Sequence, residues 1–182
     1  MIVSGPPGSG KTTLAHALAR GVPCPAICRD EIKEGLVHAL GRAPEPMEPT
    51  DGHALNVRTN AAFFETLRLL LDAGVTVVAE AAFQDRLWRS GLEAAAVAAE
   101  MRIVHCTVAP EVARERIARR LQAQEQARAA HGDADLLRQI DAGTSWTASF
   151  RSLSIAAPSI RVDTTAGYDP GLAEILAFVN RG

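Results

Sequence analysis

Residues 5–12 have the spacing Gly-x-x-x-x-Gly-Lys-Thr of a phosphate-binding loop. Its glycines allow backbone N–H groups to approach a phosphate closely, and Lys11 is long enough to reach the β- and γ-phosphate oxygens. A short apolar segment precedes the loop, and the helical pattern of residues 12–20 follows it, so the positive N-terminal end of that helix faces the phosphates. The segment therefore predicts a strand–loop–helix unit that binds a nucleoside triphosphate. The residues expected to hold the nucleotide here are Gly5, Pro6, Pro7, Gly8, Ser9, Gly10, Lys11, Thr12 and Thr13.

Composition narrows the class of protein. A length of 182 residues suits one α/β domain, and 47% apolar with 22% charged residues argues against disorder. No apolar run is long enough to cross a membrane, and no export signal is recognisable, so we expect a cytoplasmic protein. Three cysteines cannot all pair, and Cys24 and Cys28 lack a second ligand pair that would predict a metal site. A net charge of −2 makes nucleic acid an unlikely partner class on electrostatic grounds.

Short apolar segments alternate with long helical patterns along the chain. This alternation predicts an α/β fold of the P-loop NTPase type: a three-layer sandwich with a mostly parallel five-stranded sheet, helices on both faces and a helical lid. We expect one domain over residues 1–182, with the lid at about residues 116–138, and an exposed loop over residues 42–50. The expected strands are residues 1–4, 26–29, 75–80, 102–108 and 160–163. The expected helices are residues 12–20, 30–40, 52–73, 84–99, 110–131 and 170–180.

Asp30 and Lys33 follow the second expected strand. Parallel sheets bind ligands at the carboxyl ends of their strands, so Asp30 is a candidate base for a substrate hydroxyl. Its alternative role is to cap the next helix. Only two of the 19 cationic residues are lysines, Lys11 and Lys33, which favours a specific role for Lys33 near phosphate. The alternative for Lys33 is a solvated surface position.

Glu80 closes the third expected strand. An acidic residue at the end of the strand beside the P-loop strand is expected to help hold Mg²⁺. We therefore predict that Thr12 and Glu80 form the metal site. The alternative is that Glu80 caps the next segment or orients Arg86 or a substrate.

Arg116 and Arg120 share one face of the fifth expected helix. Arginine forks stabilise the negative charge that develops during phosphoryl transfer, so both are candidates for contact with the transferred phosphate. A solvated helix face would explain the same run of charges. The polar segment of residues 122–132 suits a lid that excludes water from the site.

With these motifs, the chain resembles P-loop kinases of the polynucleotide-kinase-like and chloramphenicol-phosphotransferase-like group, over nearly its whole length. The most specific match beyond the P-loop is Arg29-Asp30-Glu31-Ile32-Lys33. The resemblance implies that Asp30 activates the acceptor hydroxyl, that Lys33 assists near the phosphate, and that Arg116 and Arg120 are lid arginines. It also implies that Thr164 lies in the loop beside the adenine. Residues 80–83 depart from the polynucleotide-kinase pattern, which suggests a different acceptor pocket lined by Phe83 and Trp88.

The resemblance and the motifs together favour an ATP- and Mg²⁺-dependent kinase. Its catalytic residues would be Lys11, Asp30, Lys33 and Arg120, and its acceptor a hydroxyl of a small molecule such as a metabolite, nucleoside, sugar or antibiotic. One alternative is a polynucleotide 5′-hydroxyl kinase, which an aromatic content of 4% disfavours. Another is a nucleotide-responsive regulatory protein without kinase activity. A nucleoside monophosphate kinase would need further cations, for which Arg42 and Arg58 are candidates, whereas His53, Asn56 and Asn60 suit a neutral acceptor. The sequence leaves the acceptor and the oligomeric state open.

Overall fold

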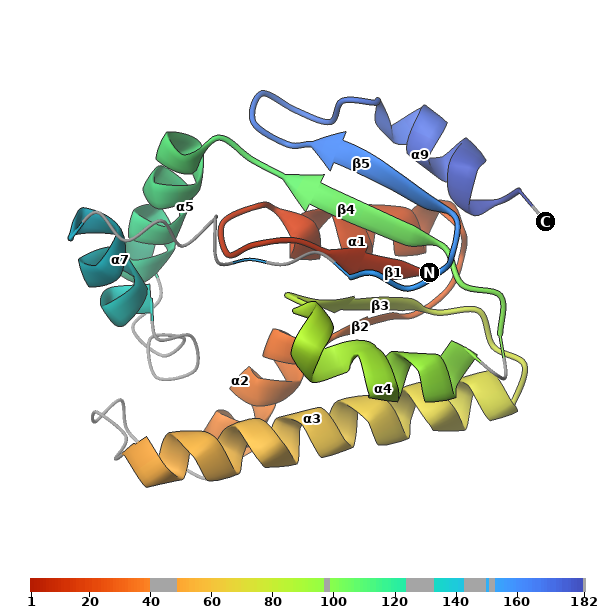
Figure 1. Ribbon diagram of the computed structural model, residues 1–182, viewed down its shortest axis with the longest axis horizontal. Coiled ribbons are helices and arrows are strands. Elements are labelled where there is room, and N and C mark those ends of the chain that lie inside the picture. Colours follow the sequence, from red (N-terminus) through yellow and green to blue (C-terminus); the bar gives the residue numbers. More distant parts are fainter. Residues whose placement is uncertain (40–48, 97–98, 124–132, 143–149, 151–152, 182) are drawn as a thin grey trace.

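A five-stranded sheet forms the centre of the computed structural model, which describes residues 1–39, 49–96, 99–123, 133–142, 150 and 153–181 (Figure 1). Every strand pairing is parallel, and the strand order is β2-β3-β1-β4-β5. The strands are β1 (Ile2–Ser4), β2 (Ala26–Cys28), β3 (Val78–Ala81), β4 (Ile103–Thr107) and β5 (Ser159–Asp163). The predicted α/β P-loop fold and its five strands are confirmed, and β3 lies between β1 and β2.

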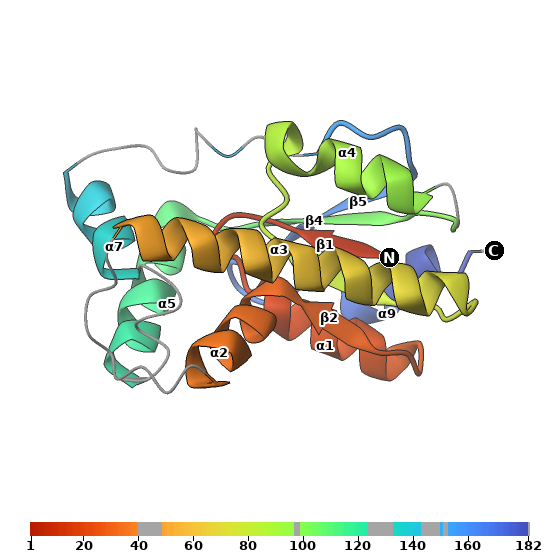
Figure 2. The same cartoon turned by 90° about the horizontal axis from the view of Figure 1, so that it is seen from below.

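Helices cover both faces of this sheet. Figure 2 shows α1 and α4 on opposite sides of it. The described helices are α1 (Lys11–Gly21), α2 (Arg29–Ala39), α3 (Pro49–Asp72), α4 (Asp85–Ala96), α5 (Pro110–Ala123), α7 (Asp133–Asp141) and α9 (Leu172–Val179). The helix expected over residues 110–131 is described only as far as residue 123. Residues 124–132, which include the rest of that helix and part of the expected lid, lie outside the described part of the chain, as do residues 42–48 of the expected loop. Residues 49 and 50, expected in the loop, instead begin α3.

Successive side chains of each strand point to opposite faces of the sheet, so the hydrophobic core has two parts, one on each face. Val3, Val78 and Val104 face α1 and α9, whereas Ile2, Ala79 and Ile103 face α3 and α4. Glu80 pairs with Val3 in the register of β3 and β1, so its side chain lies on the α1 side. The sheet geometry thus directs this carboxylate toward the start of α1.

An apolar stripe of α3 packs into the core. Phe63 and Leu67 are buried in the core on the α3–α4 side. Gly74 ends the segment after α3 with φ = 74°, a left-handed conformation that glycine adopts without strain, and its N–H donates to the Leu71 carbonyl.

Phe83 and Trp88 correct one expectation. They are 0% and 7% exposed and pack against Phe63, with ring centroids 5.1 to 5.9 Å apart. The two rings are part of the hydrophobic core because α3 and α4 close over them, so they do not line an acceptor pocket.

Among the described residues, no helix combines the length and apolarity needed to cross a membrane.

Candidate functional site

The P-loop joins β1 to α1 and has a backbone that requires glycine. Gly8 and Gly10 have φ values of 75° and 69°. A Cβ on Gly8 would also lie 2.7 Å from the Ala113 carbonyl oxygen, so α5 packs directly against the loop. Gly10 precedes α1 with no side-chain hydrogen bond that caps the helix, and the first turn carries no acidic residue. The loop therefore presents the positive end of α1 to a ligand.

Lys11, Thr12 and Glu80 meet at the start of α1. Lys11 Nζ lies 3.7 Å from Glu80 Oε1, and the Thr12 hydroxyl donates to Glu80 Oε2 at 3.1 Å. Glu80 is 1% exposed, and burial raises its pKa even though Lys11 acts in the opposite direction. The structure thus brings together Thr12 and Glu80, the two residues that the sequence predicts for the metal site. Lys11 of the P-loop lies beside them.

The same group has the chemistry that Mg²⁺ requires. Glu80 Oε1 is buried and accepts no hydrogen bond from the described residues. A hydroxyl and a carboxylate are oxygen ligands of the kind that Mg²⁺ prefers, and the ion usually keeps several waters. Thr12 and Glu80 therefore fit a magnesium site beside the phosphates.

Asp30 lies in the first turn of α2 and is held by its neighbour. Arg29 Nη1 donates to Asp30 Oδ1 at 2.9 Å, while Nη2 donates to Asn56 Oδ1 at 2.9 Å and Nε donates to Asn60 Oδ1 at 3.1 Å. One guanidinium thus connects the predicted base to two amides one helical turn apart on α3. Sequence reasoning did not find this role for Arg29, and it assigned Asn56 and Asn60 to the acceptor.

Lys33 lies one turn after Arg29 on α2. Burial lowers its pKa, and the positive charge of Arg29 acts in the same direction. Lys33 is near Arg29 and Asp30, but it does not line the P-loop cavity as the described residues define it.

Arg116 and Thr164 support the P-loop from the opposite side. Arg116 donates to the Gly8 carbonyl at 3.3 Å and to the Thr164 carbonyl at 2.6 Å. Thr164 is 3% exposed, and its hydroxyl donates to the carbonyl of Ser9, 2.8 Å away, or of Thr107, 3.0 Å away. Arg116 also lines the cavity described next, whereas Thr164 lies behind the loop.

A cavity of about 480 Å³ opens in front of the P-loop. It brings together the predicted base Asp30, the two predicted arginines of α5, Arg116 and Arg120, and part of the predicted nucleotide-binding segment, namely Gly8, Gly10, Lys11, Thr12 and Thr13. Two acidic residues that the sequence did not single out also line it, Glu31 and Glu34. Since Glu34 is one helical turn from Asp30, the helical period could have revealed it. The lining residues are Gly8, Gly10, Lys11, Thr12, Thr13, Asp30, Glu31, Glu34, Arg116, Ile117 and Arg120.

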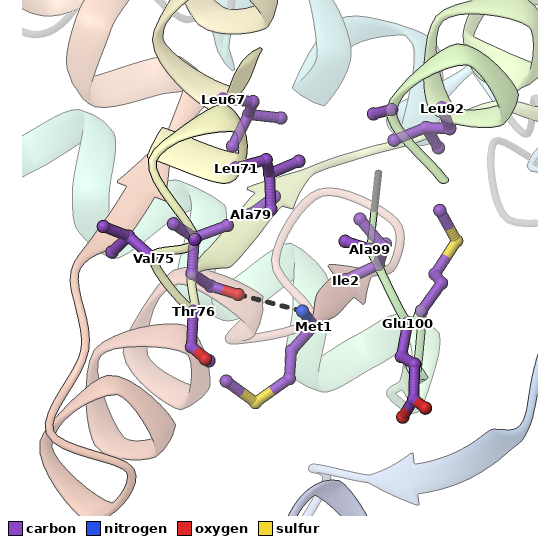
Figure 3. A pocket seen from close by; sticks show the side chains of 14 residues that line it. Met1, Ile2, Leu67, Leu71, Val75, Thr76, Ala79, Leu92, Ala99 and Glu100 are labelled. Carbon is purple, nitrogen blue, oxygen red and sulfur yellow. Dashed lines mark hydrogen bonds between the residues drawn. The ribbon is translucent and has the colours of Figure 1, made fainter. Parts of the chain in front are cut away.

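A second cavity, of about 240 Å³, lies on the α3–α4 side of the sheet (Figure 3). Leu67, Leu71 and Leu92 line it, and the carboxylate of Glu100 points away from these apolar side chains. Its lining contains no arginine, lysine or P-loop residue, so it lacks the groups that hold a triphosphate. The residues suited to hold a triphosphate line the P-loop cavity instead.

A parallel sheet of order 2-3-1-4-5, a P-loop, and a carboxylate at the end of the adjacent strand define a P-loop kinase-like domain. The chain belongs to the AAA domain family AAA_33, whose profile matches residues 1–142. The expected P-loop kinase resemblance is therefore confirmed at the level of family and fold. A comparison with curated protein sequences gave no match.

Several solved structures share this fold. A candidate kinase from Chloroflexus aurantiacus is 24% identical, with a TM-score of 0.79, over 99% of this chain and 95% of that one. A sugar kinase from Janibacter sp. HTCC2649 is 18% identical, with a TM-score of 0.60, over 98% and 92%. A gluconokinase from Sinorhizobium meliloti 1021 is 20% identical, with a TM-score of 0.56, over 99% and 90%. At these identities the likeness establishes the fold.

Proposed function

We propose that this protein is an ATP- and Mg²⁺-dependent kinase that transfers the γ-phosphate to a hydroxyl of a small molecule, within a single domain of residues 1–182 and a lid at about residues 116–138. The observation that carries the proposal is the cavity lining. Lys11, Asp30 and Arg120 come from three different helices and line one cavity with the P-loop. If the phosphate-binding loop served only to bind a nucleotide in contact with water, the Asp30 carboxylate would have no role in this cavity.

In this proposal the P-loop binds and orients the triphosphate. Backbone N–H groups of the loop and the start of α1 donate to phosphate oxygens, and Lys11 reaches the β- and γ-phosphates. Thr12 and Glu80 would hold Mg²⁺, which neutralises charge on the β- and γ-phosphates when bound. Lys11 would then exchange its contact with Glu80 for the phosphates.

Asp30 accepts the proton of the acceptor hydroxyl as the hydroxyl oxygen bonds to the γ-phosphorus; the bond from that phosphorus to the β–γ bridging oxygen breaks, and ADP leaves. Arg29 orients the Asp30 carboxylate through the contact at 2.9 Å. Arg116 and Arg120 offer N–H groups to the phosphate oxygens that carry the developing charge, and Lys33 adds positive charge near the base.

The acceptor class rests on charge and on the neighbouring structures. A net charge of −2 and an aromatic content of 4% do not favour a polynucleotide groove. Two structures with the same fold are named as a sugar kinase and a gluconokinase, which supports a small hydroxyl compound as acceptor.

The test is release of ADP from Mg-ATP, with and without a panel of sugars, nucleosides, antibiotics and a 5′-hydroxyl oligonucleotide. We expect one small acceptor to stimulate release. In Asp30→Asn, this stimulated rate should fall by at least about 100-fold, the usual contribution of a general base, while ATP affinity stays near that of the wild type. Asp72→Asn at the end of α3 is the matched control and should behave as the wild type.

Each other outcome has a defined meaning. Transfer by Asp30→Asn at the wild-type rate would exclude Asp30 as the base. Stimulation by the oligonucleotide alone would favour the polynucleotide kinase. ATP binding with no stimulation by any acceptor would favour a nucleotide-responsive regulatory protein.

A further inference from the structure

Three potential metal ligands of different chemistry meet beside the P-loop cavity. They are His16 of α1, Cys28 at the end of β2 and Glu31 in the first turn of α2, and their ligand atoms all lie within 4.8 Å of one another. His16 Nε2 is 2.6 Å from Glu31 Oε1 and 3.8 Å from Cys28 Sγ. This His16–Cys28–Glu31 cluster takes no part in the proposed kinase mechanism.

The fold explains why these residues converge. Cys28 pairs with Glu80 in the parallel register of β2 and β3, so its side chain lies on the α1 side of the sheet. His16 lies one helical turn after Thr12 and therefore on the same side of α1. Glu31 follows Cys28 by three residues, at the start of α2. Spacing within the sequence alone did not reveal the cluster, because its members come from three elements.

Two of the three ligand separations can be compared with those of a tetrahedral zinc site, and the third, between Cys28 and Glu31, is within 4.8 Å. Bonds of about 2.3 Å to sulfur and about 2.0–2.2 Å to nitrogen and oxygen place tetrahedral ligands about 3.3–3.6 Å apart. The separation of Cys28 Sγ and His16 Nε2, 3.8 Å, is close to this range already. The separation of His16 Nε2 and Glu31 Oε1 is 2.6 Å, and it must increase by less than about 1 Å to reach this range. Because these two side chains are 40% and 48% exposed, rotation of either one allows it.

The charges of the three ligands suit a dication. A metal-bound thiol loses its proton and binds as the thiolate. With neutral His16, the thiolate of Cys28 and the carboxylate of Glu31 balance the two positive charges of the ion.

We propose that His16 Nε2, Cys28 Sγ and Glu31 Oε1 bind a thiophilic divalent cation, Zn²⁺, with the fourth position open to water on the exposed side. On binding, the Cys28 proton passes to solvent and its sulfur bonds to the metal, while His16 and Glu31 each contribute a lone pair. Mg²⁺ would not compete, since it prefers oxygen ligands and near-ideal octahedral geometry. The proposed ligands therefore differ from Thr12 and Glu80, although Cys28 lies beside Glu80 in the sheet, and the inference does not depend on the kinase proposal.

The test is titration of the full-length protein with Co²⁺ and then Zn²⁺, in the absence of nucleotide. We expect one Co²⁺ per chain, a near-ultraviolet thiolate-to-cobalt charge-transfer band, and displacement of Co²⁺ by Zn²⁺ but not by Mg²⁺. Cys28→Ser should abolish the charge-transfer band. It and His16→Gln should each weaken Zn²⁺ binding by at least about 100-fold, because loss of even an outer-shell partner costs about 10- to 100-fold.

Cys24→Ser and His38→Gln are the matched controls, since both residues lie outside the cluster, and they should bind Zn²⁺ as the wild type does. His16 is exposed, so His16→Gln folds whether or not a substitution at the buried Cys28 is tolerated. The proposal is wrong if the folded wild type shows no charge-transfer band with Co²⁺, or if His16→Gln binds Zn²⁺ with wild-type affinity.

Discussion

Thr164→Val should destabilise the protein through the P-loop. Thr164 is 3% exposed, and its hydroxyl lies 2.8 Å from the Ser9 carbonyl and 3.0 Å from the Thr107 carbonyl. Valine has nearly the same shape, so no cavity forms. Thr107 keeps the backbone N–H of residue 164, 2.9 Å away. Arg116 Nη1 loses the Thr164 hydroxyl as an acceptor at 3.2 Å but keeps the Gly8 carbonyl, so the main loss is at Ser9.

One buried carbonyl that loses its side-chain donor costs about 1–3 kcal/mol. For a chain of this length, each kcal/mol lowers Tm by about 2–4 °C, so we expect a decrease of about 2–12 °C. Urea denaturation should show the same loss in the free energy of unfolding. ATP affinity should weaken as well, since the carbonyl belongs to the loop that holds the phosphates.

Thr59→Val is the matched control. Thr59 is 0% exposed, but its hydroxyl donates to the Leu55 carbonyl within the same helix, a group that the helix ladder already engages. The control should lose no more than about 0.5 kcal/mol. Equal destabilisation by the two variants would refute the reasoning. Weakened ATP binding by Thr164→Val with no loss of stability would instead indicate that Thr164 contacts the nucleotide, as the sequence resemblance implies.

Two further predictions concern Glu80 and Arg29. Burial raises the pKa of Glu80 above its ordinary value of 4.5, so the folded state binds more protons and the free energy of unfolding falls as pH rises through that value toward the folded pKa. Glu80→Gln should flatten this decline in urea denaturation at a series of pH values and raise the Mg²⁺ concentration that ATP binding requires; an unchanged pH profile would contradict the assignment. Arg29→Lys keeps the charge but loses the fork that holds Asp30, Asn56 and Asn60, so kcat should fall by about 10- to 100-fold with ATP affinity unchanged. Steady-state kinetics and ATP titration check this, with the exposed Arg119→Lys as control, and parallel loss of kcat and ATP affinity would speak against a positioning role.

The nucleotide half of the site was predictable because its signals are local. The P-loop spacing determines a backbone conformation and a helix start within eight residues, and Glu80 needed only the expectation that its strand adjoins the P-loop strand. The contact of Thr12 with Glu80 at 3.1 Å follows from these two facts.

The acceptor half was less predictable because it depends on how elements pack. Arg29 meets Asn56 and Asn60 only through the register of α2 against α3, which no spacing along the chain encodes. Phe83 and Trp88 were misassigned for the same reason: an aromatic residue after a strand can line a pocket or fill the core, and here the packing of α3 and α4 decides. The expectation that β3 adjoins β1 did not reveal that β2 lies on the far side of β3, because the order of strands in the sheet differs from their order along the chain.

This strand order sets the distance between two parts of the candidate site. Asp30 follows β2 and the P-loop follows β1, so the two are separated by the full width of β3. Two inter-strand spacings of about 4.8 Å place the strand that leads to the predicted base about 10 Å from the strand that leads to the phosphate loop. Backbone hydrogen bonds fix this length, and no side-chain substitution alters it. Adaptation of such a protein to larger or smaller acceptors would therefore change side chains of α2 and α3, while the distance between the two strands stays the same.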